Sequence, residues 1–179
     1  MSTMAQGTFD DEQKPSRVSM NESAENNWYG IRRFPWEIAS IGAHLEQLFH
    51  FWAKTLGISG PQWRMIVALA DLDQGEGAAV NTVSKMLHVD PSFVTTQSKL
   101  LEKKGFIRRE ASSEDARVVK MSLTDKTYKH LASLASQQES LNEFIYAEFS
   151  AGEMDELTGK LASLKKRLEK ACLKVAVDF

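Results

Sequence analysis

The sequence is poor in cysteine, proline and glycine, with one Cys, four Pro and ten Gly among 179 residues. A single cysteine, Cys172, excludes an intrachain disulfide, and no Cys/His cluster has the spacing of metal ligands. We therefore expect neither a metal nor another cofactor. The scarcity of helix breakers, with 42% hydrophobic residues, favours a mainly helical chain held together by packing.

Long hydrophobic runs are also missing. No stretch approaches the roughly 18 apolar residues of a membrane span, and the opening residues MSTMAQGTFDDEQKPSR lack the apolar core of a signal peptide. We expect a cytoplasmic protein with no membrane partner. There is no glycine-rich phosphate loop and no Ser or Cys nucleophile motif, and the four histidines are scattered, so an enzyme is not expected.

The charge is unevenly distributed, although the net charge is only −2. Between residues 85 and 126, nine Lys and Arg face six Asp and Glu, whereas the remainder has thirteen basic and eighteen acidic residues. A basic segment in an acidic chain is typical of a small DNA-reading face. An ordinary solvated surface is the alternative interpretation.

The first part of the chain changes character at Trp28. Residues 1–27 are polar with almost no apolar side chains, which predicts a flexible arm. Pro35 suits the first turn of a helix, and apolar residues then recur at spacings of three and four up to Leu56. We expect a long helix that begins near Pro35 and ends at Gly57.

Three shorter helices and a hairpin follow. The first of these helices opens at Pro61, and the second covers residues 80–89. The third has Asp90 as its N-cap, Pro91 in its first turn and Gly105 as a left-handed stop. The segments FIRRE and VVKMSLT then predict two strands joined by the polar loop ASSEDAR.

Helical periodicity returns at Thr124 and continues to the C-terminus in two long helices. Ser150 and Glu153 form a capping box for the second of them. Two short helices followed by a hairpin are the layout of a winged helix-turn-helix, in which the second helix enters the major groove. The predicted fold class is mainly α (α+β), a winged helix-turn-helix with a two-stranded wing and long terminal helices.

The helix after Asp90 is the candidate reading helix. Its early turns carry short hydroxyls, an amide and a lysine, which can reach base edges or phosphates. An ordinary polar helix face is the alternative. The residues concerned are Ser92, Thr95, Thr96, Gln97 and Lys99.

The stretch LEKKGFIRREASSEDARVVKMSLT resembles the signature of the MarR family, the multiple-antibiotic-resistance regulators, including the wing motif Asp-x-Arg followed by Leu-Thr. The resemblance covers roughly residues 34–175. It implies that Arg117 reaches the minor groove and that Asp115 orients its guanidinium, which suits the negative potential of a narrow groove. A surface ion pair is the alternative. Further phosphate contacts or solvated charges would be Lys103, Lys104, Arg108, Arg109 and Lys120.

The resemblance also implies a homodimer formed by the terminal helices, and hence a pseudo-palindromic DNA operator. We assign 59–123 to the DNA-binding domain, 28–58 and 124–179 to the dimerisation region, and 1–27 to the arm. Thr96 stands where the family often has Arg, and Ser98 where an apolar residue is usual. The operator sequence of other members therefore does not transfer.

Similar regulators commonly release DNA when a small aromatic acid or phenol binds between the dimer helices and the reading domain. Aromatic walls and an Arg that pairs with a carboxylate would suit such an effector. A Trp at helical spacing is a core residue more often than a ligand wall, which favours Trp52 and Trp63 as core residues. The candidate effector residues are Trp28, Tyr29, Arg32, Arg33, Phe34, Trp36, His44, Trp63 and Arg64.

The sequence thus predicts a ligand-responsive transcriptional regulator, acting as a repressor that an aromatic compound releases from its operator. Oxidation of Cys172 is an alternative input, although a place near the end of the last helix favours a small buried hydrophobe. A winged helix that binds protein is the other alternative. It would lack the steep salt dependence of phosphate contacts.

Overall fold

The computed structural model describes residues 22–72 and 77–178. The predicted arm lies outside this part up to residue 21. The described chain has six helices and three strands: α1 (Glu22–Thr55), α2 (Gly60–Leu72), β1 (Ala78–Ala79), α3 (Val80–Leu87), α4 (Pro91–Lys103), β2 (Ile107–Ala111), β3 (Val119–Leu123), α5 (Asp125–Tyr146) and α6 (Ala151–Asp178). The predicted fold class is confirmed.

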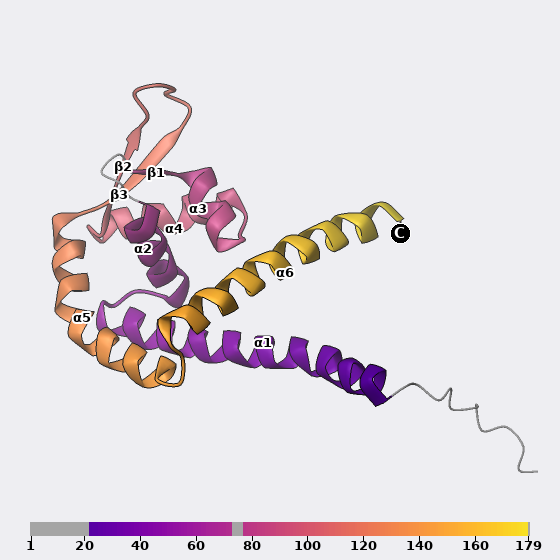
Figure 1. Ribbon diagram of the computed structural model, residues 1–179. Helices are drawn as coiled ribbons and strands as arrows, with labels where there is room; N and C mark the ends of the chain where they lie inside the picture. The colour runs from indigo at the N-terminus through magenta and orange to yellow at the C-terminus, as the bar shows by residue number, and fades with distance from the viewer. Residues whose placement is uncertain (1–21, 73–76, 179) are drawn as a thin grey trace, which may run out of the picture.

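Figure 1 shows a compact head and two long helices. The head contains α2, α3, α4 and the sheet, and the β2–β3 hairpin protrudes from it as a wing. Helix α5 leads away from the head to the start of α6, while α1 and α6 extend far beyond it. No described helix has an apolar stretch of the length that a bilayer crossing demands.

Helix α1 begins at Glu22, so the prediction that it begins near Pro35 is wrong. Pro35 lies inside the helix, where its missing N–H removes one backbone hydrogen bond. The side chains around it are exposed, so water can hydrate the carbonyl that loses its partner. The helix thus takes in residues 22–27, which composition assigned to the arm.

The core lies where α2, α3 and α4 pack against the sheet. Trp63, Leu69, Val83, Leu101 and Met121 are almost completely buried there. Burial of each large apolar side chain contributes about 1.5–3 kcal/mol, which makes this packing the main source of stability. Helix α1 joins the same core near its C-terminal end.

Two tryptophans make the junction between α1 and α2. Trp52 and Trp63 are both buried, and their rings stack with centroids 6.5 Å apart and an interplanar angle of 29°. The interpretation of these two residues as core residues is confirmed.

The sheet has the strand order β1-β3-β2, and both pairings are antiparallel. In the wing, Ile107 pairs with Leu123 and Ala111 pairs with Val119, so the predicted hairpin is confirmed. Strand β1 is only two residues long, too short to leave a period-two pattern in the sequence. For that reason the sequence did not reveal it.

Gly105 turns the chain from α4 into the wing with a backbone φ of +74°. Nothing lies within 4 Å of the position that a Cβ would occupy, so the left-handed backbone is the only obstacle to a side chain. We expect Gly105→Ala to lower the free energy of unfolding by about 1 kcal/mol. Gly152→Ala is the matched control, because Gly152 is helical and also has open space around it.

Urea unfolding of both variants measures this effect. In Gly152→Ala, the free energy of unfolding is expected to stay the same or to rise by up to about 0.5 kcal/mol, because alanine restricts the unfolded chain. Equal behaviour of the two variants would contradict a conformational role for Gly105.

Candidate nucleic-acid interface

Helices α3 and α4 form the helix-turn-helix, and Asp90 begins the second of them. The Asp90 carboxylate accepts a hydrogen bond from the backbone N–H of Ser92 at 2.7 Å, and Pro91 occupies the first turn. Hydrogen bonds from the side chain and the backbone of Ser92 hold the pKa of Asp90 below its ordinary value. The predicted cap is confirmed, and it defines where the reading helix starts.

Helix α4 packs on the core through one stripe of side chains. Val94, Ser98 and Leu101 are fully buried. At about 100° per residue, the positions on the opposite side lie roughly 130–190° around the helix from the centre of this buried stripe. These positions are occupied by Ser92, Thr96, Lys99 and Lys103, all of which are exposed. They form the outward stripe of the reading helix, and all four were predicted.

Two threonine hydroxyls on this helix are already engaged. Thr96 donates to the carbonyl of Ser92 and Thr95 donates to the carbonyl of Pro91, each at 2.9 Å. Because the protons are used inside the helix, each oxygen is left as an acceptor. Thr96 can therefore accept from the amino group of adenine or cytosine, and its methyl group can contact thymine.

Gln97 differs from the other predicted reading residues because it lies on the side of α4 that faces α2. Its Oε1 accepts a hydrogen bond from Nε2 of Gln62 at 3.1 Å. The two side chains come from positions 35 residues apart and meet inside the head. The prediction that Gln97 belongs to the DNA-facing set is not supported by this position.

The wing loop is shaped by Asp115. Its carboxylate accepts from the backbone N–H of Arg117 at 2.9 Å, and its carbonyl accepts from the N–H of Val118 at 2.9 Å. No ion pair joins Asp115 to the Arg117 guanidinium in the described residues, and the role of Asp115 in orienting the guanidinium on DNA stays a prediction. The hydrogen bond from the Arg117 backbone N–H to the Asp115 carboxylate fixes the turn, and the Arg117 side chain is exposed.

The other basic residues divide into two groups. Lys104 donates to the carbonyl of Gly57 at 2.8 Å and so ties α4 to the turn after α1. Arg109 is only 13% exposed and lies 3.8 Å from Glu102, and its Nε is buried without a partner in the described residues. These two contribute to the fold, whereas Lys103 and Arg108 are exposed and can meet phosphates.

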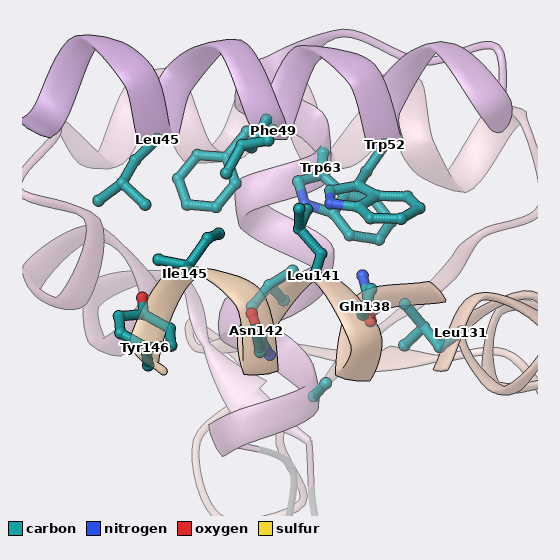
Figure 2. A pocket seen from close by; sticks show the side chains of 13 residues that line it. Leu45, Phe49, Trp52, Trp63, Leu131, Gln138, Leu141, Asn142, Ile145 and Tyr146 are labelled. Carbon is teal, nitrogen blue, oxygen red and sulfur yellow. The ribbon is translucent and has the colours of Figure 1, made fainter. Parts of the chain in front are cut away.

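A second feature is a cavity of about 530 Å³ between α1, α2 and α5. Figure 2 shows side chains of α1 pointing toward those of α5, with Trp63 of α2 behind them. Most of the lining is apolar, and its polar side chains are amides and a phenol from α5. The lining residues are Leu45, Leu48, Phe49, Trp52, Trp63, Val67, Ala70, Leu131, Gln138, Leu141, Asn142, Ile145 and Tyr146.

Of the nine predicted effector residues, Trp63 alone lines this cavity. Arg64 forms an ion pair with Glu46 at 2.7 Å, and its Nε is buried without a partner in the described residues. The other seven lie on α1 before the cavity begins and are exposed. They are Trp28, Tyr29, Arg32, Arg33, Phe34, Trp36 and His44.

The effector cluster predicted at the start of α1 is therefore not gathered within one chain. Consecutive residues of a helix point in all directions, so closeness in sequence did not make a pocket. Arg33 pairs with Glu37 at 2.9 Å, and Nδ1 of His44 lies 2.8 Å from the Ser40 carbonyl. The cavity-lining residues of α5 were missed, because their helical stripe was interpreted only as a dimerisation surface.

Cys172 is exposed on α6, so it is not the buried hydrophobe that the sequence favoured. Among the described residues, no three His, Cys, Asp or Glu side chains lie close enough together to hold a metal ion. The C-terminal helix that carries Cys172 begins with the predicted capping box. The Ser150 N–H and hydroxyl donate to Glu153 at 2.9 Å and 2.6 Å, and these bonds lower the pKa of Glu153.

The chain is similar to known proteins in both sequence and structure. The MarR family model matches residues 62–119. The uncharacterized HTH-type transcriptional regulator YdgJ of Bacillus subtilis (strain 168) is 27% identical over 112 residues, which is 63% of this chain and 66% of that relative. A MarR/EmrR family transcriptional regulator from Acinetobacter sp. ADP1 has a similar structure, with a TM-score of 0.65 and 22% identity over 79% of this chain and 98% of that chain.

A structure of MepR from S. aureus in complex with DNA is similar as well. Its TM-score is 0.64 and its identity is 18%, over 75% of this chain and 96% of that chain. At these identities the solved structures establish the fold.

Proposed function

Because the chain belongs to the MarR family of winged helix-turn-helix transcriptional regulators, we propose that it binds operator DNA as a homodimer and represses transcription until a small aromatic compound releases it. The family consists of regulators and not of enzymes. The observation that carries the proposal is the outward stripe of α4, in which two hydroxyls and two lysines stand opposite the buried stripe. Such a stripe suits both base edges and phosphates.

The proposed dimer uses the long terminal helices. Large apolar side chains remain exposed along α1 and α6 in the single chain, among them Trp36 with 78% exposure. Apolar patches of this extent mark association surfaces, and a two-fold axis lets both copies use the same patch. Supporting residues include Trp28, Tyr29, Ile31, Phe34, Leu157, Leu161, Leu168 and Leu173.

Selection of DNA duplexes from a random-sequence pool tests the DNA-binding part of the proposal. Two reading helices related by a two-fold axis should enrich an inverted repeat with half-site centres about 10 base pairs apart. Enrichment of no sequence, or of a site without two-fold symmetry, would overturn it. The MepR complex with DNA supports the choice of DNA as the partner.

The proposed effector site is the cavity between α1, α2 and α5. A volume of about 530 Å³ accommodates a small aromatic molecule, and Trp52 and Trp63 supply flat apolar walls. Its polar groups, Gln138, Asn142 and Tyr146, are uncharged hydrogen-bonding groups suited to a phenol. No cationic side chain lines it among the described residues, so a phenol fits better than an aromatic carboxylate.

Release would follow from a shift in conformational populations. The cavity is bounded by the terminal helix α1, by α5, which leads to the terminal helix α6, and by α2, which belongs to the reading head. A ligand that prefers one spacing between these elements shifts the dimer toward the corresponding separation of its reading helices. The affinity for the operator then falls by an amount set by the coupling free energy between the cavity and the DNA-binding surface.

Filling the cavity tests this assignment. Leu141→Trp should abolish operator release by an effective compound, because the larger ring occupies the ligand volume, and should keep operator affinity within about twofold. The measurement is displacement from labelled operator by phenol, 4-hydroxybenzoate and salicylate. The double variant Arg32→Ala and Arg33→Ala is the control, and we expect it to respond like the wild type.

Two results would count against the cavity as the effector site. One is a normal response of Leu141→Trp together with a lost response of the double arginine variant, which would return the site to the start of α1. The other is that none of the three compounds displaces the wild-type chain from the operator. This result would reject these compounds as effectors, while the proposed DNA binding would stand.

A further inference from the structure

Gln62 occupies a fixed position at the start of α2. It is 5% exposed, and its Oε1 accepts from the backbone N–H of Ser59 at 3.2 Å. The Ser59 hydroxyl in turn accepts from the N–H of Gln62 at 3.4 Å. This reciprocal capping box, spelled Ser-Gly-Pro-Gln in the sequence, fixes the Gln62 amide and leaves its Nε2 for another partner.

That partner is Gln97 on the reading helix, whose Oε1 accepts from Nε2 of Gln62 at 3.1 Å. Gln97 lies roughly 130° around α4 from the outward stripe, at about 100° per residue. The bond holds the Gln97 amide on the side of α4 that faces α2, away from the outward stripe. Breaking the bond would leave the Nε2 group of the buried Gln62 without this partner, which is unfavourable.

The remaining contacts between α4 and the core have little directional preference. Val94 and Leu101 are apolar, and the hydroxyl of Ser98 donates to Thr95 within the same helix at 2.9 Å. In the described part of the chain, the glutamine pair is the one side-chain hydrogen bond that we find between α2 and α4. Apolar packing fixes the separation of two helices, whereas a hydrogen bond also fixes their relative rotation.

We infer that Gln97 is a positioning residue, and that the Gln62–Gln97 pair fixes the orientation of the reading helix on α2. The inference rests on the proposed DNA binding of α4. Trp63, the neighbour of Gln62 on α2, lines the cavity, so a movement of α2 caused by a cavity ligand reaches the reading helix through this pair. Gln97 thereby connects the effector cavity with the DNA-facing stripe.

A double-mutant cycle tests the pair, with the duplex that the full wild-type chain selects as the probe. Gln62→Met and Gln97→Met should each weaken binding about fivefold, because each removes the same hydrogen bond. The double variant should be no weaker than either single variant, since the two residues act as a unit. The base preferences at every position of the duplex should stay the same in all three variants.

Three results would overturn the inference. Relaxed preference at one base position in Gln97→Met, but not in Gln62→Met, would make Gln97 a base-reading residue. Additive losses would show that the residues act separately. Unchanged affinities with a lowered unfolding temperature would reduce the pair to a stabilising contact.

Gln62→Glu serves as the conservative rescue. A carboxylate still accepts from the N–H of Ser59, and Gln97 can turn its amide to donate to the second oxygen. We expect affinity within about twofold of the wild type. A variant as weak as Gln62→Met, despite a restored unfolding temperature, would contradict the positioning role. A wild-type chain that selects no duplex would remove the proposed function, and this inference with it.

Discussion

Deletion of α6 (Ala151–Asp178) is expected to convert the dimer to a monomer and to weaken operator binding by roughly 100-fold or more. Between residues 151 and 177, only Met154 and Leu164 are even half-buried, so the helix contributes little to the packing of its own chain. Its exposed leucines are available to a second copy instead. Without them each head binds one half-site alone and loses the gain from simultaneous engagement of two.

Analytical ultracentrifugation and operator titration of the truncated chain measure both effects. Lys160→Ala is the matched control, because this lysine is exposed on α6 and pairs with Glu156 on the same helix. The control should remain dimeric with unchanged affinity. A truncated monomer that still protects the operator at low concentration would contradict the proposed dimer.

Replacement of Arg117 by alanine is expected to weaken operator binding by about 10- to 100-fold. The exposed guanidinium stands in the wing loop next to a turn that Asp115 fixes, so its backbone is already ordered before DNA binds. One lost contact with the phosphates or the minor groove should also reduce the slope of log affinity against log salt by about one.

Titrations of Arg117→Ala at several salt concentrations give both numbers. Glu114→Ala is the control in the same loop, and loss of its negative charge should keep or slightly strengthen binding. Arg117→Lys should recover part of the affinity, because lysine restores the charge without the planar fork. Unchanged affinity and salt slope in Arg117→Ala would show that the wing does not touch DNA.

The reading helix could be predicted from the sequence because its limits depend on local chemistry. Asp90 and Pro91 determine its start, and Gly105 supplies the left-handed turn after it. The outward stripe follows from the period of a helix once its buried side is known. The wing could also be predicted from the sequence, because two short strand-like segments with a polar loop between them form a local pattern.

The position of Gln97 on the side of α4 that faces α2 could not be predicted from the sequence. Its neighbour Ser98 is polar but fully buried, so composition did not reveal which side of α4 faces the core. The partner of Gln97 lies 35 residues away and is recognised only when α2 and α4 are packed together. Neither the capping box of Ser59 and Gln62 nor its link to the reading helix was predicted from the sequence.

The effector cavity needed the tertiary structure for a similar reason. Its walls come from α1, α2 and α5, from Leu45 to Tyr146, and no local pattern connects them. The aromatic start of α1 was the more conspicuous feature, yet it extends away from the head. The hydrogen bond from the Arg117 N–H to the Asp115 carboxylate was not predicted either, because it depends on the conformation of the wing loop.

The central claim, sequence-selective binding of DNA by the reading helix and wing, is tested most directly by one titration. The full chain is titrated with the selected duplex and with a scrambled duplex of equal length, at 50 mM and 200 mM salt. We expect the chain to prefer the selected duplex by at least about 1,000-fold, and both affinities to fall steeply as the salt concentration rises. Equal binding to both duplexes, or binding to neither, would contradict it and favour a winged helix that recognises protein.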